Sequence, residues 1–178
     1  MRARAGQTTK RIEDAVTANS PVLLSYFARR VDPPDDAADL LAETLLVLWK
    51  RAAALPSEDD EVRPWMFGIA RNVLLHHYRG KTRQHALVDR LRSLLAVTAR
   101  PGFVDVPDFD GLHAALRTLD EVDGEIIRLH HWDGLTLAEA SRVLRMKEGT
   151  VRSRYHRART SLRTQLEMYT PVAEQTSR

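Results

Sequence analysis

One segment near the end of the chain carries side chains that could read a nucleic acid. Its apolar positions are spaced four, three and four residues apart, which predicts one buried face of a helix. The opposite face is rich in hydrogen-bond donors and has no carboxylate. In the major groove of DNA, arginine can pair with guanine through two hydrogen bonds, and serine or histidine can reach base edges. The exposed set is Arg152, Ser153, His156, Arg157 and Thr160, opposite the apolar set Val151, Tyr155, Ala158 and Leu162.

The residues before this helix complete a helix-turn-helix pattern. Thr136 and Glu139 have the spacing of a capping box, which starts a helix, and a short turn at residues 145–149 leads to the basic helix. A helix, a tight turn and a basic second helix together are typical of proteins that read DNA with the second helix. A charged helical hairpin without a nucleic-acid role is the alternative, and motif order together with charge favours DNA binding. The buried stripe predicted for the first helix is Leu137, Ala140, Val143 and Leu144.

A second basic segment, residues 63–83, mixes aromatic and cationic side chains. Trp65 lies at helical spacing from Ile69, so a core role for Trp65 is at least as well supported as base stacking. At the end of the segment, Tyr78 and two histidines stand beside Arg79. Aromatic side chains beside a cationic groove are how proteins hold single-stranded nucleic acid.

The distribution of charge supports two such surfaces. The chain of 178 residues has 27 Lys and Arg against 24 Asp and Glu, a net charge of only +3. Acidic segments at residues 32–61 and 103–125 alternate with basic segments at 71–92 and 145–163. Two separate basic segments indicate two contacts with a polyanion, although a single one would more simply be a solvated helix face.

The residue types present exclude several classes of protein. With no cysteine, the chain can have no disulfide framework, thiolate zinc site or cysteine nucleophile. The adjacent histidines at 76–77 and 130–131 lack the i,i+4 spacing of a metal chelate. Phosphate-binding glycine patterns and catalytic constellations are also absent, which predicts a protein that is no enzyme and takes no cofactor or metal. The sequence has no apolar stretch long enough for a membrane span and no apolar run after its basic start, which predicts a soluble, cytoplasmic protein.

The pattern of apolar residues predicts an all-α fold of two small domains joined by a linker. The first domain is expected at residues 10–83, the linker at 84–110, the second domain at 111–168 and a tail at 169–178. In the first domain, Ser20 and Pro21 have the chemistry of a helix start, and Leu23, Leu24 and Phe27 are expected to face inward. A second helix is expected from after Pro34 to Ala54 and a third from around Pro64, with a further helix possible at residues 87–95.

Three segments, in this order and spacing, resemble the extracytoplasmic-function (ECF) family of RNA polymerase sigma factors. They are residues 36–52, 63–83 and 135–163, and the resemblance covers about residues 20–165. It implies sigma region two and a helix-turn-helix sigma region four, joined by a flexible linker. It also implies binding to core RNA polymerase and recognition and opening of promoter DNA, with no enzymatic activity of its own. Because many sigma factors of this family are held by an anti-sigma protein, the resemblance also implies an anti-sigma factor as a further partner.

The resemblance also assigns roles to individual positions. The surface that docks on the polymerase clamp corresponds to Asp39, Leu40, Glu43, Thr44, Leu45 and Trp49. The helix that opens the minus-ten element corresponds to Arg71, Asn72, His76, Tyr78 and Arg79, with a flipped base held between Asn72 and the loop at residues 55–62. The face that reads the minus-thirty-five element corresponds to Arg152, Ser153, His156 and Arg157, with Thr150, Arg154 and Arg159 as phosphate contacts. Acidic linker residues Asp105, Asp108 and Asp110 resemble the segment that occupies the RNA path of the polymerase.

Three positions depart from the family pattern, namely Asp120, Gly124 and Arg145. Arg145 replaces a common glycine in the turn, where a positive φ would cost about 1 kcal/mol. The loop at residues 57–61 is unusually acidic, which predicts that its pocket prefers a flipped base with amino donors, such as cytosine or adenine.

A response-regulator-type transcription factor is the alternative function, but residues 1–110 show no strand pattern for its sensor domain. A helical interaction protein without a nucleic-acid role is a third class.

Overall fold

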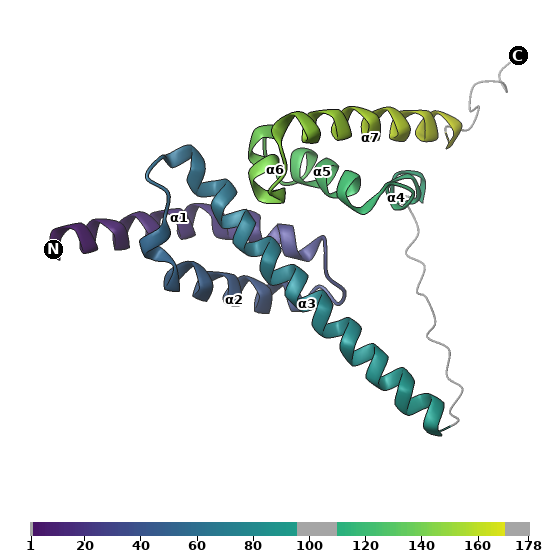
Figure 1. Cartoon of the computed structure of the whole chain (residues 1–178), viewed down its shortest axis with the longest axis horizontal. Coiled ribbons are helices and arrows are strands. Elements are labelled where there is room, and N and C mark those ends of the chain that lie inside the picture. The colour runs from purple at the N-terminus through teal and green to yellow at the C-terminus, as the bar shows by residue number, and fades with distance from the viewer. Residues whose placement is uncertain (1, 96–109, 170–178) are drawn as a thin grey trace, which may run out of the picture. The chain divides into compact units, whose positions relative to one another are not determined.

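The computed structural model describes residues 2–95 and 110–169, with side chains for 7–82, 112 and 115–167. This part of the chain forms seven α-helices and one short 3-10 turn, and it has no strand. The chain divides into two compact units, Met1–Phe103 and Val104–Arg178 (Figure 1). The predicted fold class, all-α with two helical domains, is confirmed. None of the helices described here is both long enough and apolar enough to cross a bilayer.

The first unit is built from three long helices. They are α1 (Arg2–Ala28), α2 (Asp36–Lys50) and α3 (Asp59–Leu95), with the 3-10 turn η1 (Ala52–Ala54) after α2. Each helix packs against the other two. At the centre, Tyr26 meets Phe27 and Phe67 edge-to-face, with ring centroids 5.2 and 5.5 Å apart. All three rings are fully buried, so this aromatic cluster joins α1 to α3.

The start of the first helix differs from the prediction. Instead of starting at Ser20 and Pro21, α1 begins at Arg2 and carries Pro21 in its interior. Ile12 is 1% exposed, so the buried stripe begins well before the proline, and its packing outweighs the local cost of a proline inside a helix. The Ser20 hydroxyl donates to the Val16 carbonyl at 2.6 Å in the disturbed turn. Leu24, expected inside, is 40% exposed, because the buried stripe of α1 runs through Leu23, Tyr26 and Phe27.

The other helix bounds also shift. Helix α2 ends at Lys50 rather than near Ala54, and α3 starts at Asp59, before Pro64. The acidic side chains of Asp59, Asp60 and Glu61 occupy the first turn of α3, where they interact favourably with the helix dipole. Helix α3 then continues through the expected boundary at residue 83 to Leu95, so residues 87–95 are its last turns and not a separate helix. Most of the expected linker and tail, with Asp105 and Asp108, lies outside the described residues.

The second unit contains three shorter helices around one long helix, α7 (Glu148–Tyr169). The shorter helices are α4 (Asp110–Arg117), α5 (Glu121–His131) and α6 (Leu137–Leu144). Helix α7 packs against the other three. Its predicted stripe is confirmed, since Val151, Tyr155, Ala158 and Leu162 are all buried. In α6, Ala140 is fully buried, and its small side chain allows close packing.

Both ends of α6 are closed by local hydrogen bonds. The predicted capping box is present, with the Glu139 amide donating to the Thr136 hydroxyl at 3.1 Å and the Thr136 amide donating to the Glu139 carboxylate at 2.7 Å. At the other end Arg145 adopts the left-handed conformation, with φ 55°. The Met146 amide donates to the Ser141 carbonyl at 2.9 Å, and the Arg145 amide donates to the Arg142 carbonyl at 3.2 Å. This pair of bonds is the Schellman motif, in which glycine is the usual left-handed residue.

Arg145→Gly is expected to stabilise the second unit by about 0.5–1 kcal/mol. Glycine removes the steric cost of a side chain at positive φ, and its larger entropy in the unfolded chain offsets part of that gain. Amide hydrogen exchange of α6 and α7 measures the change in this unit alone. Arg145→Ala is the control, because alanine keeps the Cβ atom and should bring no gain. Equal protection in the glycine and alanine variants would contradict a steric cost at this position.

Candidate nucleic-acid interface

The outer face of α3 presents three of the predicted DNA-binding residues together. Asn72, His76 and Arg79 follow one another at helical spacing, and all three are exposed. Asn72 and His76 also line a hollow of about 200 Å³ between α2 and α3. Glu43 and Arg51 of the neighbouring segment complete its polar lining. Its donors and acceptors could form hydrogen bonds with the edge of a base, and Arg79 adds positive charge at the same face.

Tyr78 and Lys81 lie on another side of α3, over the turn between α1 and α2. The Tyr78 hydroxyl donates to the Arg30 carbonyl, and the Lys81 ammonium donates to the Asp32 carbonyl at 2.6 Å. Lys81 also forms an ion pair of 2.7 Å with Asp36, and this contact holds the pKa of the Asp36 carboxyl below its ordinary value. Tyr78 as a whole remains 41% exposed, so its side chain is accessible for stacking while its hydroxyl holds the turn.

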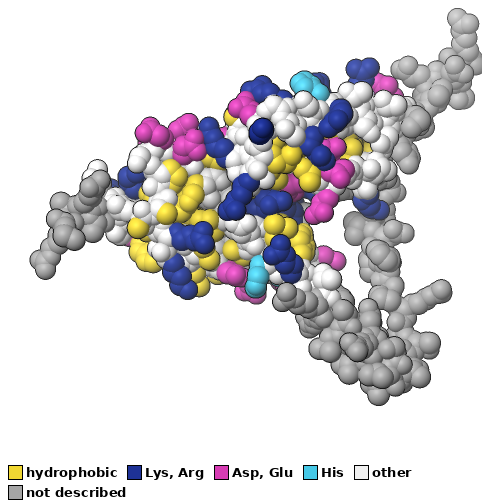
Figure 2. Space-filling model, in the orientation of Figure 1, with side chains coloured by type: hydrophobic (Ala, Val, Ile, Leu, Met, Phe, Trp, Pro, Cys, Tyr) yellow, Lys and Arg dark blue, Asp and Glu magenta, His cyan; other side chains and the backbone are white. Residues whose placement is uncertain are grey.

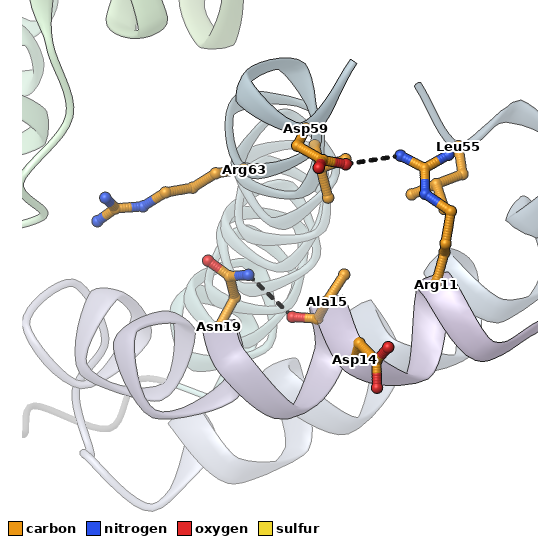
Figure 3. A pocket seen from close by; sticks show the side chains of 8 residues that line it. Arg11, Asp14, Ala15, Asn19, Leu55, Asp59 and Arg63 are labelled. Carbon is orange, nitrogen blue, oxygen red and sulfur yellow. Dashed lines mark hydrogen bonds and ion pairs between the residues drawn. The ribbon is translucent and has the colours of Figure 1, made fainter. Parts of the chain in front are cut away.

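The structure places Asn72 and the loop at residues 55–62 in different hollows. Leu55, Asp59 and Val62 line a pocket of about 480 Å³ between α1 and the start of α3 (Figure 3). Asn72 is not among the residues around this pocket. Arg11, Asp14, Asn19 and Arg63 supply its other polar groups. A flipped base held by Asn72 would therefore occupy the hollow between α2 and α3, next to Arg51 rather than Asp59.

Helix α2 has an exposed side that mixes acidic and apolar residues. Asp39 and Glu43 are exposed, and Leu46 and Trp49 on the same side are 62% and 51% exposed. Of the predicted polymerase-binding residues, Leu40 and Thr44 are instead buried and Leu45 is half-buried. Leu40 and Thr44 therefore support the helix from inside. Leu46 was missed by the sequence interpretation, although its position outside the stripe of Leu40, Thr44 and Leu48 could have revealed it.

The exposed side of α7 carries most of the predicted major-groove residues. Figure 2 shows cationic side chains and a histidine along this helix, at the top of the view. Arg157 and Arg159 make no ion pair within the described part of the chain, whereas Arg152 pairs with Glu148 one turn earlier. The Ser153 hydroxyl donates to the Gly149 carbonyl at 2.9 Å, which leaves its lone pairs available. The exposed predicted residues of this face are Thr150, Arg152, Ser153, His156, Arg157, Arg159 and Thr160.

Arg154 differs from its neighbours because it points toward α5. Its Nε donates to Asp123 at 2.6 Å, and its guanidinium also pairs with Asp120. Its side chain is only 25% exposed. Asp120 additionally caps α5 by accepting from the Val122 amide at 3.0 Å. The two carboxylates thus occupy the guanidinium that was predicted to contact a phosphate, and they fix the first turns of α7 against α5.

Two histidines at the end of α5 lie beside the same helix. The His131 ring stacks on Tyr155 with centroids 5.8 Å apart, and its Nε2 lies 3.1 Å from the Tyr155 hydroxyl. Partial burial lowers the pKa of His131, and the positive charges of His130 and Arg159 lower it further. The Nδ1 of His130 donates to the Leu135 carbonyl at 2.8 Å. The histidine pair therefore serves packing in this unit.

Comparison with known families agrees with this division of the chain. The family model of Sigma-70 region 2 matches residues 15–84, and that of Sigma-70, region 4, matches residues 109–162. The first match covers the α2 and α3 surfaces, and the second covers the helix-turn-helix. These two regions together define a sigma factor of bacterial RNA polymerase.

Individual relatives narrow the class. The chain is 27% identical over 158 residues to the ECF RNA polymerase sigma factor SigL of Mycobacterium tuberculosis, covering 84% of this chain and 85% of that protein. It is 29% identical over 160 residues to the ECF RNA polymerase sigma factor EcfG of Rhodopseudomonas palustris, covering 86% and 84%. The chain belongs to the ECF family of RNA polymerase sigma factors. It thus binds core RNA polymerase and directs promoter recognition and transcription initiation, and the response-regulator alternative is not favoured.

Solved structures show the same fold. The sigma factor RpoE of Bartonella quintana, in complex with the anti-sigma factor NepR, has a TM-score of 0.66 and 23% identity over 89% of this chain and 98% of that one. CnrH, in complex with the cytosolic domain of CnrY, has a TM-score of 0.63 and 22% identity over 94% and 97%.

Proposed function

We propose that three exposed surfaces divide the work of this sigma factor. The exposed side of α2 docks on the polymerase, the outer face of α3 opens the minus-ten element, and the exposed side of α7 reads the minus-thirty-five element. The observation that supports this division most directly is that each surface is the solvent face of a helix whose opposite face is buried. The proposed domain bounds remain residues 10–83 and 111–168. The protein acts in the cytoplasm, where its polymerase and promoter are, and without catalytic chemistry of its own.

On α2, the proposed docking surface consists of Asp39, Glu43, Leu46 and Trp49. Exposed aromatic and aliphatic side chains surrounded by acids are suited to a partner that offers an apolar pocket with a basic rim. Asp39 faces the polymerase rather than the promoter in this assignment, which accounts for acidic side chains in a protein that binds DNA, whereas Glu43 also borders the hollow between α2 and α3. Leu40 and Thr44 act from inside, by holding the helix in place.

Trp49→Ala should weaken binding to core polymerase by about 1–3 kcal/mol, because a large exposed aromatic is a typical hot spot. Asp39→Ala should also weaken binding, more strongly at low salt than at high salt. Fluorescence anisotropy of the labelled protein titrated with core polymerase measures both. Leu24→Ala is the matched control, since it removes an exposed leucine from α1, outside the proposed surface. Wild-type affinity in both the Trp49 and Asp39 variants would reject the docking surface.

On α3, the proposed opening surface consists of Asn72, His76 and Arg79 on the outer face, with Tyr78 contributing from another side of the helix, next to Arg79 in sequence. Flipping a base costs a few kcal/mol, which stacking and hydrogen bonds in a pocket must offset. The hollow lined by Asn72 and His76 offers such hydrogen bonds, the Tyr78 ring offers a stacking face, and Arg79 offers attraction to the strand. In this assignment the loop at residues 55–62 forms one wall of the single-strand path, which is the route of the melted DNA strand over α3. The loop does not share the flipped base with Asn72.

On α7, we propose that Arg157 contacts a base. Arg157→Ala should reduce discrimination between correct and altered minus-thirty-five elements by about 1–3 kcal/mol, because a bidentate contact distinguishes bases by that amount. The measurement compares holoenzyme affinities for duplexes that differ at one position of the element. A loss of equal size for every sequence would show that Arg157 contacts only phosphate.

Arg154 is expected to act through folding rather than through phosphate. Arg159→Ala should lower the slope of log affinity against log salt by about 0.9, the value for one lost phosphate contact, whereas Arg154→Ala should leave that slope unchanged. The Arg154 variant should instead lose about 1–2 kcal/mol of stability, because Asp123 then lacks its partner. A reduced salt slope with unchanged stability in the Arg154 variant would restore its assignment as a phosphate contact.

We further propose an anti-sigma protein as a regulatory partner. RpoE and CnrH, which share the fold, were solved in complexes with an anti-sigma factor and with the cytosolic domain of CnrY, respectively. The exposed apolar residues of α2 are a surface that such a partner could cover in competition with the polymerase. Because the chain has no cysteine, any thiol-based sensing would belong to the partner.

A further inference from the structure

We propose that Arg11 is a positioning residue that ties the loop at residues 56–59 to α1 and thereby sets one wall of the single-strand path. This inference rests on the proposed function of α3 and its neighbouring loop. It adds a role for a part of the helix that precedes the Sigma-70 region 2 match, which begins at residue 15.

A single nitrogen of Arg11 makes the attachment. Its Nη2 lies 3.1 Å from the Pro56 carbonyl oxygen, 3.0 Å from the Ser57 carbonyl oxygen and 3.0 Å from the Asp59 carboxylate. Two N–H groups thus serve three acceptors, so the bonds must be shared. Figure 3 shows the Arg11 side chain extending from α1 toward Asp59. The contacts join residues 45 to 48 positions apart in sequence.

The carbonyl contacts matter more than the ion pair. The Asp59 side chain is 95% exposed, so its pairing with Arg11 contributes little in water. The Pro56 and Ser57 carbonyls, in contrast, belong to the backbone of the loop, and a donor shared between them restricts the backbone itself. Arg11 is only 35% exposed, which favours a defined side-chain position over a freely moving one. Lysine also carries its donors on one nitrogen, so the cleaner tests of this contact are alanine, which removes the donors, and glutamine, which removes the charge.

The attachment has a consequence for the path of the DNA strand. The loop leads directly into Asp59, the first residue of α3, whose outer face carries Asn72 and His76 further along. The loop and the first turn of α3 carry a run of exposed hydrogen-bond acceptors, namely Ser57, Glu58, Asp59 and Asp60. If the loop moved outward, its acids would approach the phosphates of a strand on α3 and repel them. Arg11 holds the loop against α1 and partly neutralises it, which favours strand capture.

The first experiment measures the loop directly, without polymerase. Because the chain has no cysteine, Glu58→Cys provides a single site for a nitroxide label. Arg11→Ala and Arg11→Gln should both increase the mobility seen in the nitroxide spectrum. Lys10→Ala removes the same charge from the preceding, exposed position of α1 and should leave the spectrum unchanged. Identical spectra for wild type and both Arg11 variants, with helix content retained, would overturn the proposal.

The second experiment measures promoter opening by unlabelled holoenzyme. Arg11→Ala and Arg11→Gln should slow strand opening about threefold to tenfold, while Asp59→Asn and Lys10→Ala have smaller effects. Affinity for a minus-thirty-five duplex should stay at the wild-type value in all four variants, which separates a local role from general loss of folding. Opening rates in the Arg11 variants equal to that of Lys10→Ala would overturn the proposal.

Asn72→Ala distinguishes failure of this inference from failure of the proposed function. If Asn72→Ala slows opening and the Arg11 variants do not, the α3 surface stands and the role of Arg11 is rejected. If Asn72→Ala has no effect on opening, the assignment of the α3 surface is rejected, and with it the role of Arg11 in opening.

Discussion

Burial of one side of a helix decides which of its side chains meet water, and each candidate surface of this protein depends on that constraint. In α7, Val151 and Ala158 are 0% and 2% exposed, which leaves His156 and Arg157 only the outer side. In α3, burial of Val73 and Leu74 has the same effect on Asn72. A change in either buried stripe would therefore rotate the presented side chains. The candidate surfaces are consequences of the core.

Internal pairing limits how many cations these surfaces can offer to DNA. The basic segment at residues 145–163 looks uniformly available in sequence, but Arg154 is held by Asp120 and Asp123, and Arg152 by Glu148. Arg163 pairs with Glu167, so the bases of this segment without an ion pair within the described residues are Arg145, Lys147, Arg157 and Arg159. In the first unit, Lys81 is similarly engaged with Asp36. Charge in such a helix is divided between positioning the helix and binding the polyanion, so a count of bases overestimates the binding surface.

The parts of the structure that follow from periodicity could be predicted from sequence, and the parts that depend on distant contacts could not. The buried stripe of α7 and the capping box of α6 are local patterns, and both are present. Pro21 is also a local signal, but burial of Ile12 outweighs it and extends α1 toward the N-terminus. Arg154 donates to a carboxylate 31 residues away, and nothing near Arg154 in sequence indicates that partner. The two-domain fold was therefore predictable, whereas the division of arginines between structure and binding was not.

The composition of the α2 surface suits a subunit that must bind its partner and leave it again. Leu46 and Trp49 keep more than half of their surface exposed in the isolated protein, at 62% and 51%. Covering them in a complex removes apolar area from water, worth about 25 cal/mol per Å². A permanent interface would be larger and more apolar than this. Asp39 and Glu43 beside the apolar pair keep this surface hydrated when no partner is bound. Their negative charge would attract a basic partner, and salt screens this attraction and shortens its range. Weak apolar contact combined with screened charge allows association to be both fast and reversible.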